Sequence, residues 1–173
     1  PGAINVYDPG ALNITDVVVG QLDELAGEAS MLYNRQGAEL AMTGQIHGLV
    51  TLPVTQASTK LAGYDYPGQA EYFAKLAGNL PFTTILIYRD FRAALFTTHM
   101  PLIEACSMVN KDNLLNKIKY LHAKRLDLGF PYLSLAIASL NPHAGESGTM
   151  GREEIDVIEP SIEEARALGI DVD

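Results

Sequence analysis

The chain has 173 residues, of which 47% are hydrophobic and 19% charged, a balance typical of a globular protein rather than a disordered segment. Its formal net charge of −9 argues against a nucleic-acid partner, because binding to phosphate backbones needs clustered Lys and Arg. No apolar run approaches membrane-spanning length, and the first residues lack the basic and apolar segments of a signal peptide. We therefore expect a cytoplasmic protein with neither a membrane nor a nucleic-acid partner. Its ends, Pro1 and Asp173, suggest a chain cut from a longer one.

Apolar patterns along the chain predict alternating strands and helices. The first half is predicted to contain a short strand at 4–7, a helix at 22–42 stopped by Gly44, a buried strand at 47–52, a helix capped by Thr55 and running to Leu61, a turn at 64–68 and a helix at 69–76. The second half is predicted to contain strands at 83–88 and 91–97 joined as a hairpin, helices at 103–109 and 113–128, a buried strand at 133–138, and helices at 152–158 and 161–168 split by Pro160. A further strand can start after Gly169. This alternation predicts a single α/β domain over residues 1–173, an α/β sandwich with a largely parallel sheet and one antiparallel hairpin.

Two histidines follow apolar strand-like runs, at the strand ends where α/β proteins place ligand sites. His99 comes after RAALFT, and His143 lies in the stretch LNPHAGESGTMGREE, which spans residues 140–154. Neutral imidazole is the commonest transition-metal ligand, so the pair is a candidate metal site. Two histidines do not fill the shell of a divalent metal, so a further ligand has to come from a carboxylate, another subunit or a segment outside the chain. The alternative is two unrelated hydrogen-bonding histidines, and the spacing alone leaves both open.

Two turns lead into predicted helix N-termini, where unpaired backbone N–H groups favour anions. The turn at 64–68 precedes Gln69 and Ala70, and can bind a phosphate or carboxylate or simply cap the helix. The glycines of residues 145–151 have neither the GxGxxG nor the GK[ST] pattern of a nucleotide loop, so a tight connecting loop is an equal alternative. No cofactor-binding residue is identified.

Three other reactive side chains favour structural roles. Cys106 is the single cysteine, which excludes an internal disulfide, and its context IEACSMV predicts a buried small hydrophobe. His122 lies on the flank of a predicted helix and is expected at the surface or boundary. His47 opens a predicted strand and is expected to be structural.

Several blocks, in the same order, resemble the 4-hydroxythreonine-4-phosphate dehydrogenase family of pyridoxal phosphate biosynthesis. The segment LVTLPVTQASTKLAGYDYPGQAEYFAKLAG is similar to the family pattern VTxPINKxxLxxAGYxYPGHTEFLA. FRAALFTTHMPL is similar to RVALVTTHxPL, and SLNPHAGESGTMGREEIDVIEP to LNPHAGEgGxxGxEExxxIxP. The resemblance covers nearly the whole chain, as the central part of a longer two-lobed enzyme.

The resemblance implies an α/β/α sandwich like that of the isocitrate and isopropylmalate dehydrogenases, in an obligate homodimer. It implies oxidation of a hydroxy acid such as 4-phosphooxy-threonine by NAD or NADP, with decarboxylation, and a divalent metal (Zn, Mg or Co) that polarises the alcohol oxygen. By the match, His99 and His143 are two of three metal-binding histidines, and the third belongs to a later YHDQG-like block supplied by the partner subunit. Gln69 and Ala70 fall where the family has a substrate-binding His-Thr pair.

The chain departs from the family pattern in two ways. The opening block and the YHDQG-like block are absent from the chain. In addition, Gln69 and Ala70 replace the His-Thr pair, and Gln56 replaces the lysine of PINK. Losing an imidazole, a hydroxyl and a cation weakens an anion site, so a related hydroxy acid, phosphorylated or not, is also an expected substrate. The alternative function is a truncated or degenerate relative that binds a small acid without turnover or serves in assembly.

Overall fold

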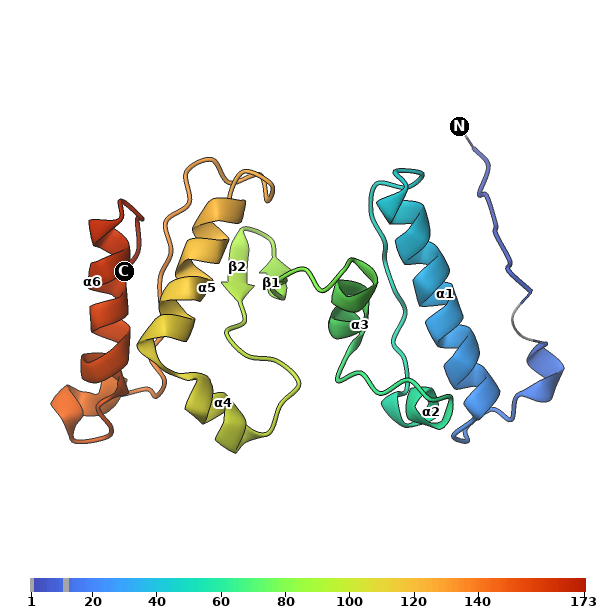
Figure 1. Ribbon diagram of the computed structural model, residues 1–173, viewed down its shortest axis with the longest axis horizontal. Coiled ribbons are helices and arrows are strands. Elements are labelled where there is room, and N and C mark those ends of the chain that lie inside the picture. Colours follow the sequence, from blue (N-terminus) through green and yellow to red (C-terminus); the bar gives the residue numbers. More distant parts are fainter. Residues whose placement is uncertain (1, 11–12) are drawn as a thin grey trace. The chain divides into compact units, whose positions relative to one another are not determined.

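The computed structural model describes residues 2–10 and 13–173, which fall into two compact units, Pro1–Thr84 and Ile85–Asp173. The first unit contains the 3-10 turn η1 (Ile14–Asp16) and the helices α1 (Glu24–Met42), α2 (Gln56–Leu61) and α3 (Gln69–Leu76) (Figure 1). The second contains strands β1 (Ile85–Tyr88) and β2 (Phe91–Ala94), helices α4 (Leu102–Met108), α5 (Lys111–Lys124) and α6 (Glu159–Ala167), the 3-10 segment η2 (Ala144–Gly148) and the π-helical segment η3 (Glu154–Ile158). The expected single domain over the whole chain stays a prediction.

Helix α1 organises the first unit. It begins at Asp23, whose side-chain Oδ1 accepts the Ala26 N–H at 2.8 Å, as an N-cap should. Gly27 lies so close to α2 that a Cβ built on it would be 2.1 Å from the Ser58 carbonyl oxygen. The hydroxyl of Tyr72 in α3 donates to the Met31 carbonyl at 3.4 Å, which ties α3 to the same helix. The unit's buried apolar side chains are Ala29, Met31, Ala38 and Tyr72.

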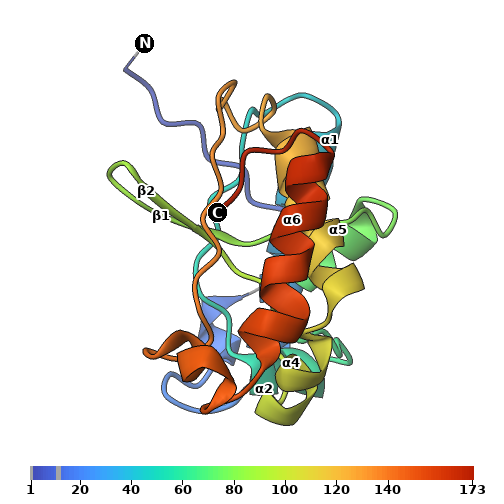
Figure 2. The ribbon, with the colours of Figure 1, turned by 90° about the vertical axis from the view of Figure 1, so that its left-hand side faces the viewer.

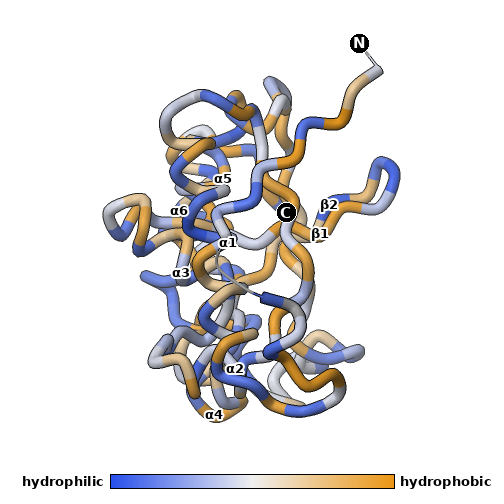
Figure 3. The backbone as a smooth tube through the Cα atoms, turned by 90° about the vertical axis from the view of Figure 1, so that its right-hand side faces the viewer, coloured by the Kyte–Doolittle hydropathy of each residue, from blue (hydrophilic) through white to orange (hydrophobic). Residues whose placement is uncertain are grey.

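The predicted hairpin is confirmed, although its strands are shorter than expected. β1 and β2 pair antiparallel, with Ile85 opposite Ala94 and Tyr88 opposite Phe91. The turn between them is hydrophilic (Figure 3) and uses Arg89 with a φ of 51°. Both strands carry exposed apolar side chains, so the hairpin covers little of the core by itself.

The core of the second unit lies between α5 and α6, which run side by side (Figure 2). It consists of Leu114, Leu115, Ile118, Ile158, Ala165, Ile170 and Val172. Ile118 is only 1% exposed, and the Ser161 hydroxyl, also buried, donates to the Val157 carbonyl at 2.7 Å. An ion pair of 2.8 Å between Lys111 Nζ and Glu164 Oε2 joins the two helices at the surface.

Three predicted strands were wrong. Residues 4–7 and 47–52 form no strand, and Val50, expected to be buried, is 96% exposed. The segment 133–138 is reduced to one parallel bridge between Leu135 and Val172. A strand has to exchange its backbone hydrogen bonds with a neighbour, and the described residues offer no parallel neighbour to these segments beyond that bridge. The α/β class holds, but the described residues contain only a two-stranded antiparallel sheet instead of a largely parallel one.

The predicted break at Pro160 was also wrong, because η3 continues directly into α6. Pro160 occupies the first turn of α6, where its missing N–H is tolerated. The π-helical turn ahead of it widens the helix at the place where an α-helix would aim a carbonyl at the proline ring. The other predicted helices are confirmed within a few residues of their predicted ends, and α3 has the predicted bounds. No helix in the part of the chain that the structure describes is long and apolar enough to cross a membrane.

Candidate functional site

The loop from Leu140 to Glu154 is ordered around one side chain, that of Asn141. Its Oδ1 accepts the backbone N–H of His143 at 3.0 Å and that of Gly145 at 3.3 Å. Its Nδ2 donates to the Met150 carbonyl at 3.3 Å, across the loop. This role of Asn141 was not predicted from the sequence, although an Asn ahead of Pro142 is a typical turn signal.

The centre of this loop runs through left-handed backbone. Ala144, Gly145, Glu146 and Ser147 have φ values of 47°, 70°, 44° and 55°. For a residue with a side chain this conformation costs roughly 1–2 kcal/mol, so three non-glycine residues among four consecutive positions are a considerable local strain. Such strain persists only where surrounding contacts fix it, and it clusters at functional sites.

His143 is fixed by its backbone and exposed at its side chain. Its φ of −103° and ψ of 2° lie in the sparsely populated bridge region. Its N–H is bonded to Asn141 and its carbonyl accepts the Glu146 N–H at 2.9 Å. The side chain is 58% exposed, with Nδ1 3.7 Å from Glu146 Oε2. An imidazole on a strained and hydrogen-bonded loop is well suited to bind a ligand, with Glu146 as the nearest carboxylate.

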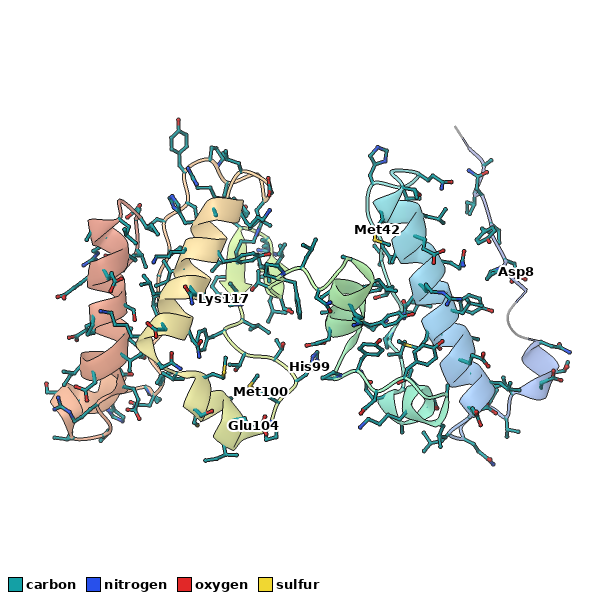
Figure 4. All side chains as sticks on the ribbon, in the orientation of Figure 1. Asp8, Met42, His99, Met100, Glu104 and Lys117 are labelled. Carbon is teal, nitrogen blue, oxygen red and sulfur yellow. The ribbon has the colours of Figure 1, made fainter. Side chains whose placement is uncertain are left out.

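His99, the second predicted metal ligand, lies on the loop that leads from β2 to α4 (Figure 4). It also has left-handed backbone, with a φ of 51°, and its residue surface is exposed. Both histidines therefore belong to the second unit and sit on loops after apolar segments, as predicted. Across residues 2–10 and 13–173 no group of three or more His, Cys, Asp or Glu side chains is placed to hold a metal ion. The imidazoles have the right chemistry for Zn²⁺ or Co²⁺, but these residues do not complete a coordination shell.

The predicted substrate residues Gln69 and Ala70 open α3 in the first unit. Gly68 is the N-cap and supplies no side-chain bond to the first turn, whose N–H groups have no partner within a helix. Gln69 is engaged internally, because its Nε2 donates to the Leu52 carbonyl at 3.2 Å and its Oε1 accepts from Thr51 Oγ1 at 3.5 Å.

Gln56 has a similar internal role, since its Nε2 donates to the Pro67 carbonyl at 3.3 Å. Gln56 thus links α2 to the turn at 64–68, and Gln69 links the start of α3 to the segment ahead of α2. A small hollow lies beside them, lined by Met31, Val54, Gln56, Thr59, Tyr64, Tyr66, Gly68 and Gln69. Around this hollow Tyr72 packs edge to face against Tyr66, with ring centroids 5.0 Å apart. Burial raises the pKa of the Tyr72 hydroxyl, as do the neighbouring Tyr64 and Tyr66, so Tyr72 is neutral in the site.

The remaining candidates are placed as follows. Cys106 is exposed, so the prediction of a buried side chain was wrong: α4 buries none of its residues. His122 is half-buried near the end of α5, at the boundary as expected. His47 is exposed in a segment that forms no strand.

Comparison with known proteins identifies the family. The sequence profile described as "Pyridoxal phosphate biosynthetic protein PdxA" matches residues 2–173. The chain belongs to the PdxA family. It is 35% identical over 161 residues to the 4-hydroxythreonine-4-phosphate dehydrogenase of Aquifex aeolicus, covering 93% of this chain and 50% of that one. It is 31% identical over 172 residues to the D-threonate 4-phosphate dehydrogenase of Pectobacterium atrosepticum, covering 99% of this chain and 53% of the relative. The chain thus spans about half the length of these PdxA relatives.

Solved structures of the PdxA family share the fold. The 4-hydroxythreonine-4-phosphate dehydrogenase of Klebsiella pneumoniae superposes with a TM-score of 0.85 at 29% identity, covering 100% of this chain and 52% of that one. A more distant match is a terephthalate 1,2-cis-dihydrodiol dehydrogenase from Burkholderia xenovorans, with a TM-score of 0.58 at 27% identity, covering 99% of this chain and 55% of that one. The predicted resemblance to the 4-hydroxythreonine-4-phosphate dehydrogenases is confirmed.

Proposed function

We propose that this chain is part of a dehydrogenase that oxidises a hydroxy acid with a phosphate on carbon 4, with NAD or NADP as electron acceptor and subsequent decarboxylation. The observation that carries the proposal is the family match over residues 2–173, which includes the ordered His143 loop. The two relatives above are named for 4-hydroxythreonine 4-phosphate and D-threonate 4-phosphate. Both are four-carbon hydroxy acids with a terminal phosphate, so this class is the first choice of substrate.

His99 and His143 are the residues that would hold a divalent metal, and their imidazoles favour Zn²⁺ or Co²⁺ over Mg²⁺, which prefers oxygen ligands. The chemistry such a cation supplies when bound is polarisation of the alcohol oxygen of the substrate. The chain's own contribution is orientation: Asn141 fixes the backbone of His143 and leaves its imidazole exposed. The proposed homodimer would supply the missing ligand from the partner subunit.

The N-terminus of α3 is the proposed site for the substrate's anionic group. Its first-turn N–H groups and the positive end of the helix dipole favour a phosphate or carboxylate. Gln69 and Ala70 lie there, and Gln69 is held against Leu52. No Lys or Arg lines the adjoining hollow, so the anion would be bound by neutral donors.

The proposed fold of the native-length protein is the α/β/α sandwich implied by the family resemblance. Residues 47–52 belong to no helix or strand, and their apolar side chains Val50 and Leu52 are 96% and 83% exposed. The Leu135–Val172 bridge is parallel. Both features are expected of strands whose sheet neighbours belong to other parts of a longer polypeptide. A cytoplasmic location stays a prediction.

A second candidate is oxidation of a hydroxy acid that carries no phosphate. The neutral residues Gln56, Gln69 and Ala70 favour it, because phosphate binding gains most from charge-assisted hydrogen bonds. A relative of the same fold is named for the cis-dihydrodiol of terephthalate, a diol whose name indicates no phosphate.

The test begins with the intact mass of the protein from its source, because the assay needs the native length. A mass about twice the 18.7 kDa of this chain is expected. Reduction of NAD⁺ and NADP⁺ is then followed at 340 nm with 4-phosphooxy-threonine, D-threonate 4-phosphate, their dephosphorylated forms and a cis-dihydrodiol carboxylate. Turnover of the phosphorylated acids supports the first proposal, and turnover confined to the others supports the second. A folded protein of 18.7 kDa that binds the acids without turnover would contradict both.

A further inference from the structure

Glu154 is a buried acidic residue at the base of the His143 loop. It opens η3 and is only 8% exposed. Its Oε1 accepts the backbone N–H of Leu140 at 3.1 Å, fourteen residues earlier in the chain. Its Oε2 is buried and has no hydrogen-bond partner among the described residues. The carboxylate therefore joins the two ends of the loop that carries His143.

The same carboxylate contacts the middle of the loop at Gly145. A Cβ built on Gly145 would lie 2.8 Å from Glu154 Oε2 and 3.1 Å from the Gly151 carbonyl oxygen. Gly145 also has a φ of 70° and is buried. Space and backbone conformation therefore both favour glycine at this position, where it lies against the carboxylate.

Gly145 and His143 are coupled through a shared acceptor. The N–H groups of both residues donate to Oδ1 of Asn141, and Asn141 follows Leu140 directly in the chain. Movement of Leu140 or Gly145 away from Glu154 would therefore disturb the Asn141 bonds that hold His143.

We propose that Glu154 is a positioning residue that holds the His143 loop in its left-handed conformation through Leu140 and Gly145. Burial of a carboxylate oxygen without a hydrogen-bond partner is unfavourable. Proteins keep such an unfavourable group where it holds a strained functional segment in place. The effect of Glu154 on the order of the loop follows from these contacts alone. Its effect on ligand binding rests on the proposed metal role of His143.

The test compares three variants of the native-length protein with the wild type. Glu154→Ala removes the carboxylate, Glu154→Gln keeps an oxygen that can accept the Leu140 N–H, and Glu153→Ala makes the same deletion at an exposed neighbour. Amide hydrogen exchange is measured by NMR without added metal. We expect exchange at Leu140, His143 and Gly145 to be about tenfold faster or more in Glu154→Ala, closer to wild type in Glu154→Gln, and unchanged in Glu153→Ala. Unchanged exchange in Glu154→Ala would overturn the proposal.

Cobalt binding gives a second readout. Supporting residues of a metal ligand typically change affinity by about 10–100-fold, so Co²⁺ titration should show a loss of about tenfold or more in Glu154→Ala and rescue by Glu154→Gln. If the wild type binds no Co²⁺, the metal role of His143 fails, and the exchange rates alone decide the positioning role. If Glu154→Ala does not fold, Glu154→Asp replaces it. The shorter aspartate side chain keeps the charge but should lose the contact with Leu140. Exchange rates and Co²⁺ affinity equal to those of the wild type in that variant would also contradict the proposal.

Discussion

His143 combines a constrained backbone with an exposed imidazole. Asn141 accepts its N–H, the Glu146 N–H binds its carbonyl, and the side chain is 58% exposed. His143 could be predicted from the sequence as a candidate ligand, because it lies in a glycine-rich loop after an apolar, strand-like run. The roles of Asn141 and Glu154 were not predicted. A side chain that accepts hydrogen bonds from backbone groups across a loop leaves no periodic pattern in the sequence.

Removal of either predicted metal ligand should abolish tight metal binding. We expect His99→Ala and His143→Ala to lower Zn²⁺ or Co²⁺ affinity by about 100-fold or more, because changes in mere supporting residues already cost about 10–100-fold. Calorimetric titration of the native-length protein with Zn²⁺ or Co²⁺ measures the effect. His47→Ala is the matched control, since His47 is exposed and lies in the other unit. Wild-type affinity in both site variants would remove the metal assignment.

Gln56, beside the turn at 64–68, is the position where an added positive charge should strengthen phosphate binding. Gln56→Lys should strengthen inhibition by inorganic phosphate by about tenfold, because a hydrogen bond to a charged group contributes about 1.5–3 kcal/mol. The substitution removes the hydrogen bond from Gln56 to the Pro67 carbonyl. A lysine ammonium can donate to the same carbonyl and replace that bond. Gln45→Lys adds the same charge at an exposed position in the same unit and should have no effect. Equal inhibition constants in all three proteins would show that the anion binds elsewhere.

At the scale of elements, helices were predictable and isolated strands were not. The cap at Asp23 and the stop at Gly44 are local signals, and α1 begins and ends next to them. Residues 47–52 have the apolar composition of a strand, but strand formation depends on neighbours that no local pattern supplies. Gly37 lies inside α1, where glycine is unfavourable by helix propensity. A Cβ there would lie 2.7 Å from Leu49 Cδ1, so the side chain of Leu49 would have to move.

Close helix packing makes Gly27 sensitive to substitution. Gly27→Ala should destabilise the first unit by about 1–3 kcal/mol, since its Cβ would overlap the Ser58 carbonyl and the helices have to separate. This opposes the gain of about 1 kcal/mol that alanine normally gives over glycine in a helix. Gly48→Ala, whose added Cβ meets nothing within 4 Å, should leave the melting temperature nearly unchanged. Thermal unfolding by circular dichroism measures both, and a stabilised Gly27→Ala would contradict the packing.

The ion pair between α5 and α6 predicts a pH dependence. The hydrogen bond and charge of Lys111 lower the pKa of Glu164 below its ordinary value of 4.5, while Glu164 raises that of Lys111. The stabilisation from Glu164 is therefore fully present above pH 4.5 and is lost as the pH falls through the lowered pKa. We expect Glu164→Gln to melt lower than wild type at pH 7 and to approach wild type below the lowered pKa of Glu164. Glu163→Gln should show a smaller convergence, because Glu163 acts on Lys111 through its charge without the hydrogen bond. A difference independent of pH would exclude the ion pair as its cause.

At the scale of the whole molecule, the chain spans about half of its relatives and forms two units with several exposed apolar segments. The family could be predicted from sequence because the motifs around His99 and His143 are contiguous and specific. A complete coordination shell could not be predicted, since no group of three or more metal-ligating side chains occurs among the described residues. We propose that a homodimer of the native-length protein completes the coordination shell.

Crystal diffraction from the native-length protein grown with Co²⁺, recorded at the cobalt absorption edge, tests the central claim most directly. The account predicts one strong anomalous peak about 2.0–2.2 Å from imidazole nitrogens of both His99 and His143, with a further ligand from outside the described residues. A peak bound to only one of these histidines, or to neither, would contradict it.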